Sequence, residues 1–93
     1  MIIGTINATL HLQAVASLKD KRRIVKSLIG RLQSRFNISV AEVDRQDSKL
    51  MAVIGIAVVA TDTKFANQQL DAVVTFMQND HRFYLGQVER ETF

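Results

Sequence analysis

The chain has 93 residues, of which 47% are hydrophobic and 23% are charged, and its formal net charge at pH 7 is +3. A chain of this length has room for one modest core, so we expect a single domain over residues 1–93. The absence of cysteine excludes disulfide frameworks, zinc ribbons and thiol chemistry, and it suits a reducing cytoplasm, where we expect the protein to reside.

The longest apolar stretch is residues 50–60, with the sequence LMAVIGIAVVA. It is much shorter than the ~20 residues that a membrane-spanning helix needs. Its β-branched side chains predict a buried strand instead. The chain also begins with MIIGTINATL, which lacks the basic region and cleavage site of a signal peptide, so we expect no signal peptide. We also expect no membrane partner.

The first half of the chain has the pattern of a strand, a helix and a strand. Residues 2–12 alternate between apolar and more polar side chains, which predicts the first strand. Ser17 and Asp20 resemble a capping box, and an amphipathic helix over residues 18–35 follows them. Residues 36–44 alternate again and predict a second strand.

The second half begins with the polar cluster at residues 44–49, which predicts a hairpin leading into the apolar strand at residues 50–60. Asp62 can cap a second helix over residues 63–79. Residues 83–93 return to the alternation of a strand.

The resulting order is βαββαβ, without a repeat or linker. This order predicts an α+β fold of the ferredoxin-like type, an antiparallel four-stranded sheet with both helices on one face. Right-handed crossovers place the first and third strands at the centre of such a sheet.

The third strand is apolar on both of its faces, although the helices of this fold cover only one. Uncovered apolar patches of several hundred Å² are uncommon on monomers, so we expect a homodimer that forms through the sheet or its edge. A curled hairpin or the terminal residues covering this face is the alternative. The uncovered set comprises Met51, Val53, Ala57 and Val59.

Positive charge is concentrated in the first helix. Residues 19–35 carry seven basic side chains and one acid, a local balance of +6, so the other segments sum to −3. At 100° per residue, several of these side chains lie opposite the apolar stripe. The basic residues are Lys19, Lys21, Arg22, Arg23, Lys26, Arg31 and Arg35.

Such a stripe can span neighbouring phosphates, which makes nucleic acid, and RNA in particular, the expected partner. The binding residues we expect are Lys19, Lys21, Arg22, Arg23 and Lys26, assisted by Arg45 and Lys49 of the hairpin loop. The alternative is that the stripe is only the polar side of a solvent-exposed helix, because lysine and arginine are good helix formers.

The sequence does not contain the signatures of other functional sites that occur in proteins of this topology. The first and third strands contain no Phe, Tyr or Trp for stacking bases, so we expect RNA to contact the helix and loops rather than the sheet. Residues 13–17 lack the glycine and arginine of an acylphosphatase loop. His11 and His81 are better explained as surface or capping residues than as metal ligands or bases. We therefore expect no enzyme activity, cofactor, metal or small-molecule ligand.

Two segments carry a family resemblance: S-L-K-D-K-R-R at residues 17–23 and V-A-E-V-D at residues 40–44, followed by AVIGIAVVATD at residues 52–62. Together they resemble the YlxP-like family of small bacterial proteins of unassigned function. The resemblance implies a ferredoxin-like fold and, because the genes of such proteins lie among those for translation and ribosome maturation, work on RNA or the ribosome. This chain departs from many relatives at Gln13, Arg45 and the pair Ser48 and Lys49, where they have a proline, a histidine and an aromatic residue.

Overall fold

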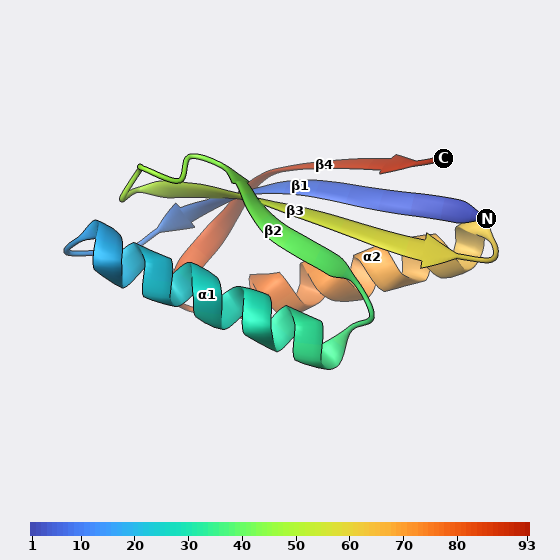
Figure 1. The fold of residues 1–93 in the computed structure, drawn as a ribbon, viewed down its shortest axis with the longest axis horizontal. Helices are drawn as coiled ribbons and strands as arrows, with labels where there is room; N and C mark the ends of the chain where they lie inside the picture. The colour runs from blue at the N-terminus through green and yellow to red at the C-terminus, as the bar shows by residue number, and fades with distance from the viewer.

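Strands and helices alternate along the chain in the expected order. The computed structural model describes residues 1–93. Its elements are β1 (Ile2–Leu12), α1 (Leu18–Arg35), β2 (Ser39–Asp44), β3 (Met51–Ala60), α2 (Thr63–Gln78) and β4 (Phe83–Thr92), arranged as Figure 1 shows. The structure confirms the predicted α+β, ferredoxin-like arrangement.

The four strands form one antiparallel sheet in the order β2-β3-β1-β4, with β1 and β3 at the centre as expected. Ile6 of β1 lies opposite Ile56 of β3, and this register continues along both strands. The pairing of β1 with β4 shifts between Ala8 and Leu10, and that of β2 with β3 shifts between Glu42 and Asp44. Both helices lie on the same side of the sheet (Figure 1).

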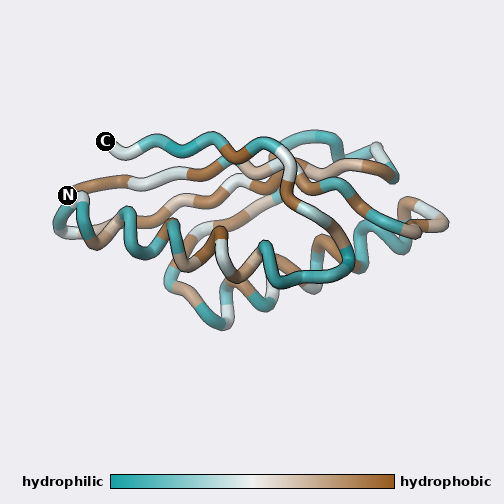
Figure 2. The backbone as a smooth tube through the Cα atoms, turned by 180° about the vertical axis from the view of Figure 1, so that it is seen from behind, coloured by the Kyte–Doolittle hydropathy of each residue, from teal (hydrophilic) through white to brown (hydrophobic).

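The core lies between the sheet and the two helices. The alternation of β1 directs Ile6, Ala8 and Leu10 toward the helices, where they are buried. From the other layer, apolar positions three, four and seven residues apart on each helix face the sheet. These positions are Val25, Leu28 and Leu32 of α1 and Ala66, Leu70, Val73 and Met77 of α2. Figure 2 shows the apolar stretches of the central strands and the hydrophilic end of β4.

Both helices begin at the residues that the sequence indicates. The Ser17 hydroxyl accepts a hydrogen bond from the Asp20 N–H at 3.1 Å, and the Asp62 carboxylate accepts one from the Phe65 N–H at 2.7 Å. These bonds satisfy backbone donors that a helix start leaves free. Neither helix combines the length and apolar character needed to cross a membrane.

The second strand is shorter than predicted. Phe36 ends α1, because its N–H still bonds to the Leu32 carbonyl, and β2 begins only at Ser39. The alternation at residues 36–38 reflects packing rather than strand pairing, since Phe36 and Ile38 pack against the core from the connection.

Candidate nucleic-acid interface

The outer face of α1 presents a row of cations to solvent. Lys19, Arg22, Arg23 and Lys26 are all exposed. They are exposed because Val25, Leu28 and Leu32 on the opposite side of the helix are buried against the sheet. We call these four side chains the basic crest of α1. Gly30 continues it, and a β-carbon at this position would meet nothing within 4 Å.

Lys21, which the sequence placed among the phosphate-binding residues, lies inside the protein. It is fully buried, and its Nζ lies 2.7 Å from Oε2 of Glu42. The same amine donates hydrogen bonds to the carbonyls of Arg45 at 2.6 Å and Gln46 at 3.3 Å. We therefore correct the site and leave Lys21 out of it, because its charge and donors are already used by the protein.

The position of Lys21 along the helix distinguishes it from the exposed cations on either side of it in the sequence. It precedes Val25 by four residues and Leu28 by seven, which places it on the apolar stripe and not on the polar face.

The loop of residues 45–50 adjoins the basic crest. Lys21 connects the loop to the first turns of α1, because its amine donates hydrogen bonds to two carbonyls of the loop. In addition, the Arg22 guanidinium lies 4.0 Å from the Asp47 carboxylate. Arg45 has a φ of 61°, in the left-handed region, and its N–H donates to Asp44 at 2.7 Å. The structure thus brings the exposed side chains of Arg45 and Lys49 to the end of the molecule where the basic crest begins.

Farther along α1, two arginines that the predicted site did not include flank a hollow. The guanidinium carbon of Arg31 lies 5.2 Å from the centre of the Phe76 ring, and that of Arg35 lies 5.4 Å from it. The ring is a favourable partner for both cations. Lys26, Ser27 and Ser34 line the same hollow of about 450 Å³. The missed signal was the i, i+4 spacing of two arginines on the flank of α1.

Asp80 lowers the positive charge at this end of α1. Its carboxylate accepts three hydrogen bonds from Arg82, two from the guanidinium at 2.9 and 2.6 Å and one from the backbone N–H at 3.0 Å, and it lies 3.6 Å from Arg31. The hydrogen bond from the Arg82 side chain is the main cause that holds the pKa of Asp80 below its ordinary value, and the same pair raises the pKa of Arg82. Arg82 also donates to the Ser27 hydroxyl at 3.1 Å, which joins the start of β4 to α1.

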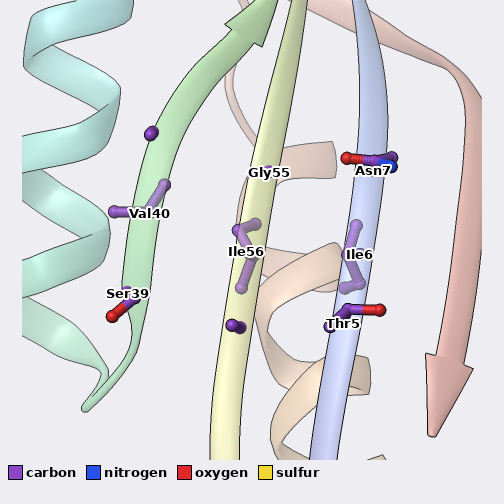
Figure 3. Close-up of a pocket in the computed structure, with 9 residues that line it drawn as sticks. Thr5, Ile6, Asn7, Ser39, Val40, Gly55 and Ile56 are labelled. Carbon is purple, nitrogen blue, oxygen red and sulfur yellow. The ribbon is translucent and has the colours of Figure 1, made fainter.

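The sheet face opposite the helices is open. Val59 on this face is 63% exposed, while Met51, Val53 and Ala57 are partly exposed. Gly55 and the small side chains around it leave a shallow hollow of about 400 Å³ across β2, β3 and β1 (Figure 3). A β-carbon on Gly55 would lie 2.8 Å from Val43, so this position has no room for a side chain. The lining of the hollow contains no ionisable side chain.

Two rings are stacked at one end of the open face. The centroids of His11 and Tyr84 are 4.9 Å apart and their planes differ by 17°. The sequence argument missed this pair because it considered only Phe, Tyr and Trp on β1 and β3. His81 is exposed in the connection between α2 and β4, and no three His, Asp or Glu side chains are grouped closely enough to hold a metal ion.

Comparison with known proteins supports the resemblance seen in the sequence. Residues 3–90 match the family described as "Protein of unknown function (DUF503)". The chain is also similar to the "Uncharacterized protein YlxP" of Bacillus subtilis (strain 168), with 30% identity over 78 residues that cover 84% of this chain and 85% of the relative. The family match includes most of each of the six elements and both segments, S-L-K-D-K-R-R and V-A-E-V-D. The chain therefore belongs to the DUF503 family, the family of YlxP.

Proposed function

We propose that the protein is a non-enzymatic module that binds RNA, alone or within the ribosome, through the basic crest of α1. The observation that carries this proposal is the concentration of exposed cations on one helix face. By contrast, α2 carries Lys64 and Asp71 as its charged residues. A solvated helix needs polar side chains, but it does not need them to be cations of one sign.

The side chains of the basic crest suit phosphate chemistry. Arginine donates two parallel hydrogen bonds to phosphate oxygens, and lysine supplies a compact charge. The contact between Arg22 and Asp47 is 4.0 Å long and its side chains are 62% and 97% exposed, so it holds Arg22 only weakly. Arg45 and Lys49 extend the cationic surface around the end of the molecule.

The first prediction concerns the salt dependence of RNA binding. Four phosphate contacts on a single strand give a slope of log K against log salt of about −3, which is roughly a 50-fold loss of affinity between 50 and 200 mM salt. We expect this slope in a titration of the protein with single-stranded RNA, and a slope at least as steep with structured RNA and with isolated ribosomal subunits. The triple variant Arg22→Glu, Arg23→Glu, Lys26→Glu should lose the binding.

A matched pair of variants separates the basic crest from net charge. Lys26→Glu and Lys64→Glu change the charge equally, and both lysines are exposed on a helix, one on α1 and one on α2. We expect Lys26→Glu to weaken binding at least several-fold more than Lys64→Glu, with circular dichroism confirming that both variants fold. Equal effects of the two variants, or binding that is independent of salt, would contradict the proposal.

A second candidate function is self-association through the open sheet face. Its support is the row of apolar side chains on β3 that no helix covers, with Val59 63% exposed, and the adjoining Val43, which is 50% exposed. Two copies placed face to face would remove these side chains from water. In this second proposal, the protein acts as a homodimeric assembly factor.

A further inference from the structure

We propose that the stacked rings of His11 and Tyr84 are a platform for an unpaired nucleobase, so that the preferred ligand is single-stranded or looped RNA. This inference rests on the proposed function and specifies its ligand. It places a base contact on the sheet, at the end where the loop of residues 45–50 joins the basic crest.

The platform is built by neighbouring strands. His11 of β1 and Tyr84 of β4 lie opposite each other in the register, on the face that the helices leave open. Tyr84 is 56% exposed, so much of its surface is accessible to a ligand. The residue two positions farther along β4 is Gly86, where a β-carbon would lie 2.3 Å from Nε2 of His11. Any other residue at position 86 would displace the imidazole from its place beside Tyr84.

The chemistry of the pair suits a base better than a phosphate. Proteins that read unpaired RNA stack its bases on the flat faces of Phe, Tyr, Trp and His. Every base has such a face, so stacking tolerates many sequences. A phosphate, in contrast, cannot stack on the ring faces and is held by cations and hydrogen-bond donors.

The platform adjoins the loop of residues 45–50. His11 is paired with Met51, and the N–H of the next residue, Leu12, donates to the carbonyl of Leu50 at 2.9 Å. Lys49 directly precedes Leu50 and belongs to the loop that Lys21 fastens to α1. A strand with one base on the rings therefore has the cations Arg45 and Lys49 beside it for its phosphates, together with the exposed carboxylate of Asp47.

The opposite direction along the sheet is unfavourable for phosphate. Glu89 and Glu91 of β4 lie opposite Asn7 and Thr5 of β1, which share the open face with His11. Both glutamates are exposed. Their charge repels the phosphates of RNA. An RNA strand with a base on the platform should therefore continue toward the loop of residues 45–50.

The chain offers a direct signal for this contact. It contains no tryptophan and a single tyrosine, Tyr84, so its tyrosine fluorescence reports only on the platform. We expect oligoadenylate to quench this fluorescence on binding, after correction for absorbance by the oligonucleotide. Inorganic polyphosphate, which has charge but no base, should compete for the basic crest without quenching.

Variants of the two ring residues test whether the rings are responsible for the binding of oligoadenylate. We expect Tyr84→Leu and His11→Leu to weaken oligoadenylate binding about tenfold, measured by the anisotropy of a labelled oligonucleotide, and to leave polyphosphate binding unchanged. Tyr84→Phe should retain the affinity. Phe93→Leu is the matched control, because Phe93 is also exposed, at 64%, but is paired with Ile3 at the other end of β1; it should bind like the unmodified protein. Circular dichroism and thermal unfolding show that each variant folds.

The outcomes separate the two proposals. If oligoadenylate and polyphosphate both bind without quenching, or if Tyr84→Leu binds oligoadenylate normally, the platform is wrong and the phosphate surface stands. If oligoadenylate quenches Tyr84 while Lys26→Glu binds it normally, the platform stands and the role of the basic crest is wrong. Binding of neither ligand would overturn both.

Discussion

Lys21 illustrates how a lysine is accommodated within an apolar helix stripe. Its amine donates hydrogen bonds to the carbonyls of Arg45 and Gln46, and its charge is paired with the Glu42 carboxylate, whose Oε2 lies 2.7 Å away. The Glu42 side chain is only 15% exposed, so each charge depends on the other for compensation. Burial without such partners would cost several kcal/mol per ion.

We therefore expect Lys21→Met to lower the free energy of unfolding by about 3 kcal/mol, because it leaves the Glu42 carboxylate without a counter-charge. Urea denaturation measures this change. Lys19→Met is the control: Lys19 is exposed on the same helix, so its loss should change stability by no more than about 0.5 kcal/mol. Similar effects of the two substitutions would show that the buried pair is not what stabilises this region.

At the scale of elements, Asp80 and Arg82 connect α1, α2 and β4. Asp80 follows the end of α2 and Arg82 precedes β4. Arg82 donates a hydrogen bond to Ser27 of α1, and the Asp80 carboxylate forms an ion pair with Arg31 of α1. The Asp80 side chain is 6% exposed and that of Arg82 is 34% exposed, so the pair is only partly screened by water. It fixes the start of β4, and Tyr84 is two residues beyond Arg82 on this strand.

This pair predicts a pH dependence of stability. Because the pKa of Asp80 is lower in the folded chain than its ordinary value of 3.8, the pair stabilises the protein above that pH. The contribution is lost as the pH falls through the folded pKa. We expect Asp80→Asn to cost about 1–2 kcal/mol at pH 7, discounted for the exposure of Arg82.

The difference between Asp80→Asn and the unmodified protein should shrink below about pH 4, where the unmodified carboxyl also becomes protonated. Thermal unfolding followed at several pH values measures it. Asp71→Asn is a suitable comparison, because its exposed bond to Arg90 should contribute less. A constant difference down to the lowest pH would contradict the assignment to Asp80.

The elements were largely predictable, because periodicity and capping are local properties. The bounds of β1 and α1 match the prediction, and Ser17 and Asp62 cap the helices as expected. The candidate site could be predicted only where its residues lie close together in the sequence, as those of the basic crest do. The stack of His11 on Tyr84 was not, since it depends on the register of two strands more than 70 residues apart in the sequence.

At the scale of the whole molecule, the two sides of the sheet differ in character. One side is covered by helices, and α1 carries the cationic surface. The other side is open, with exposed Val59 at one end of β3 and Met51, opposite His11, at the other end. Val59 and the platform therefore lie at opposite ends of the strand.

Self-association gives the last prediction. We expect a dimer in sedimentation equilibrium and a monomer for Val59→Glu, because a buried unpaired carboxylate opposes association. Leu50→Glu is the control, since Leu50 is 71% exposed beyond the opposite end of β3; this variant should remain dimeric. A protein that stays monomeric at high concentration would remove the open face as a self-association surface.

The open space at Gly30 has a practical consequence for identifying partners. Apart from its chain neighbours and the backbone of its own helix, no atom lies within 4 Å of where its β-carbon would be, and the chain contains no cysteine. Gly30→Cys would therefore introduce a unique thiol beside the basic crest, in a position that requires no rearrangement of the helix. A photoactivatable crosslinker attached to this thiol would covalently mark whichever molecule rests on α1 in the living cell.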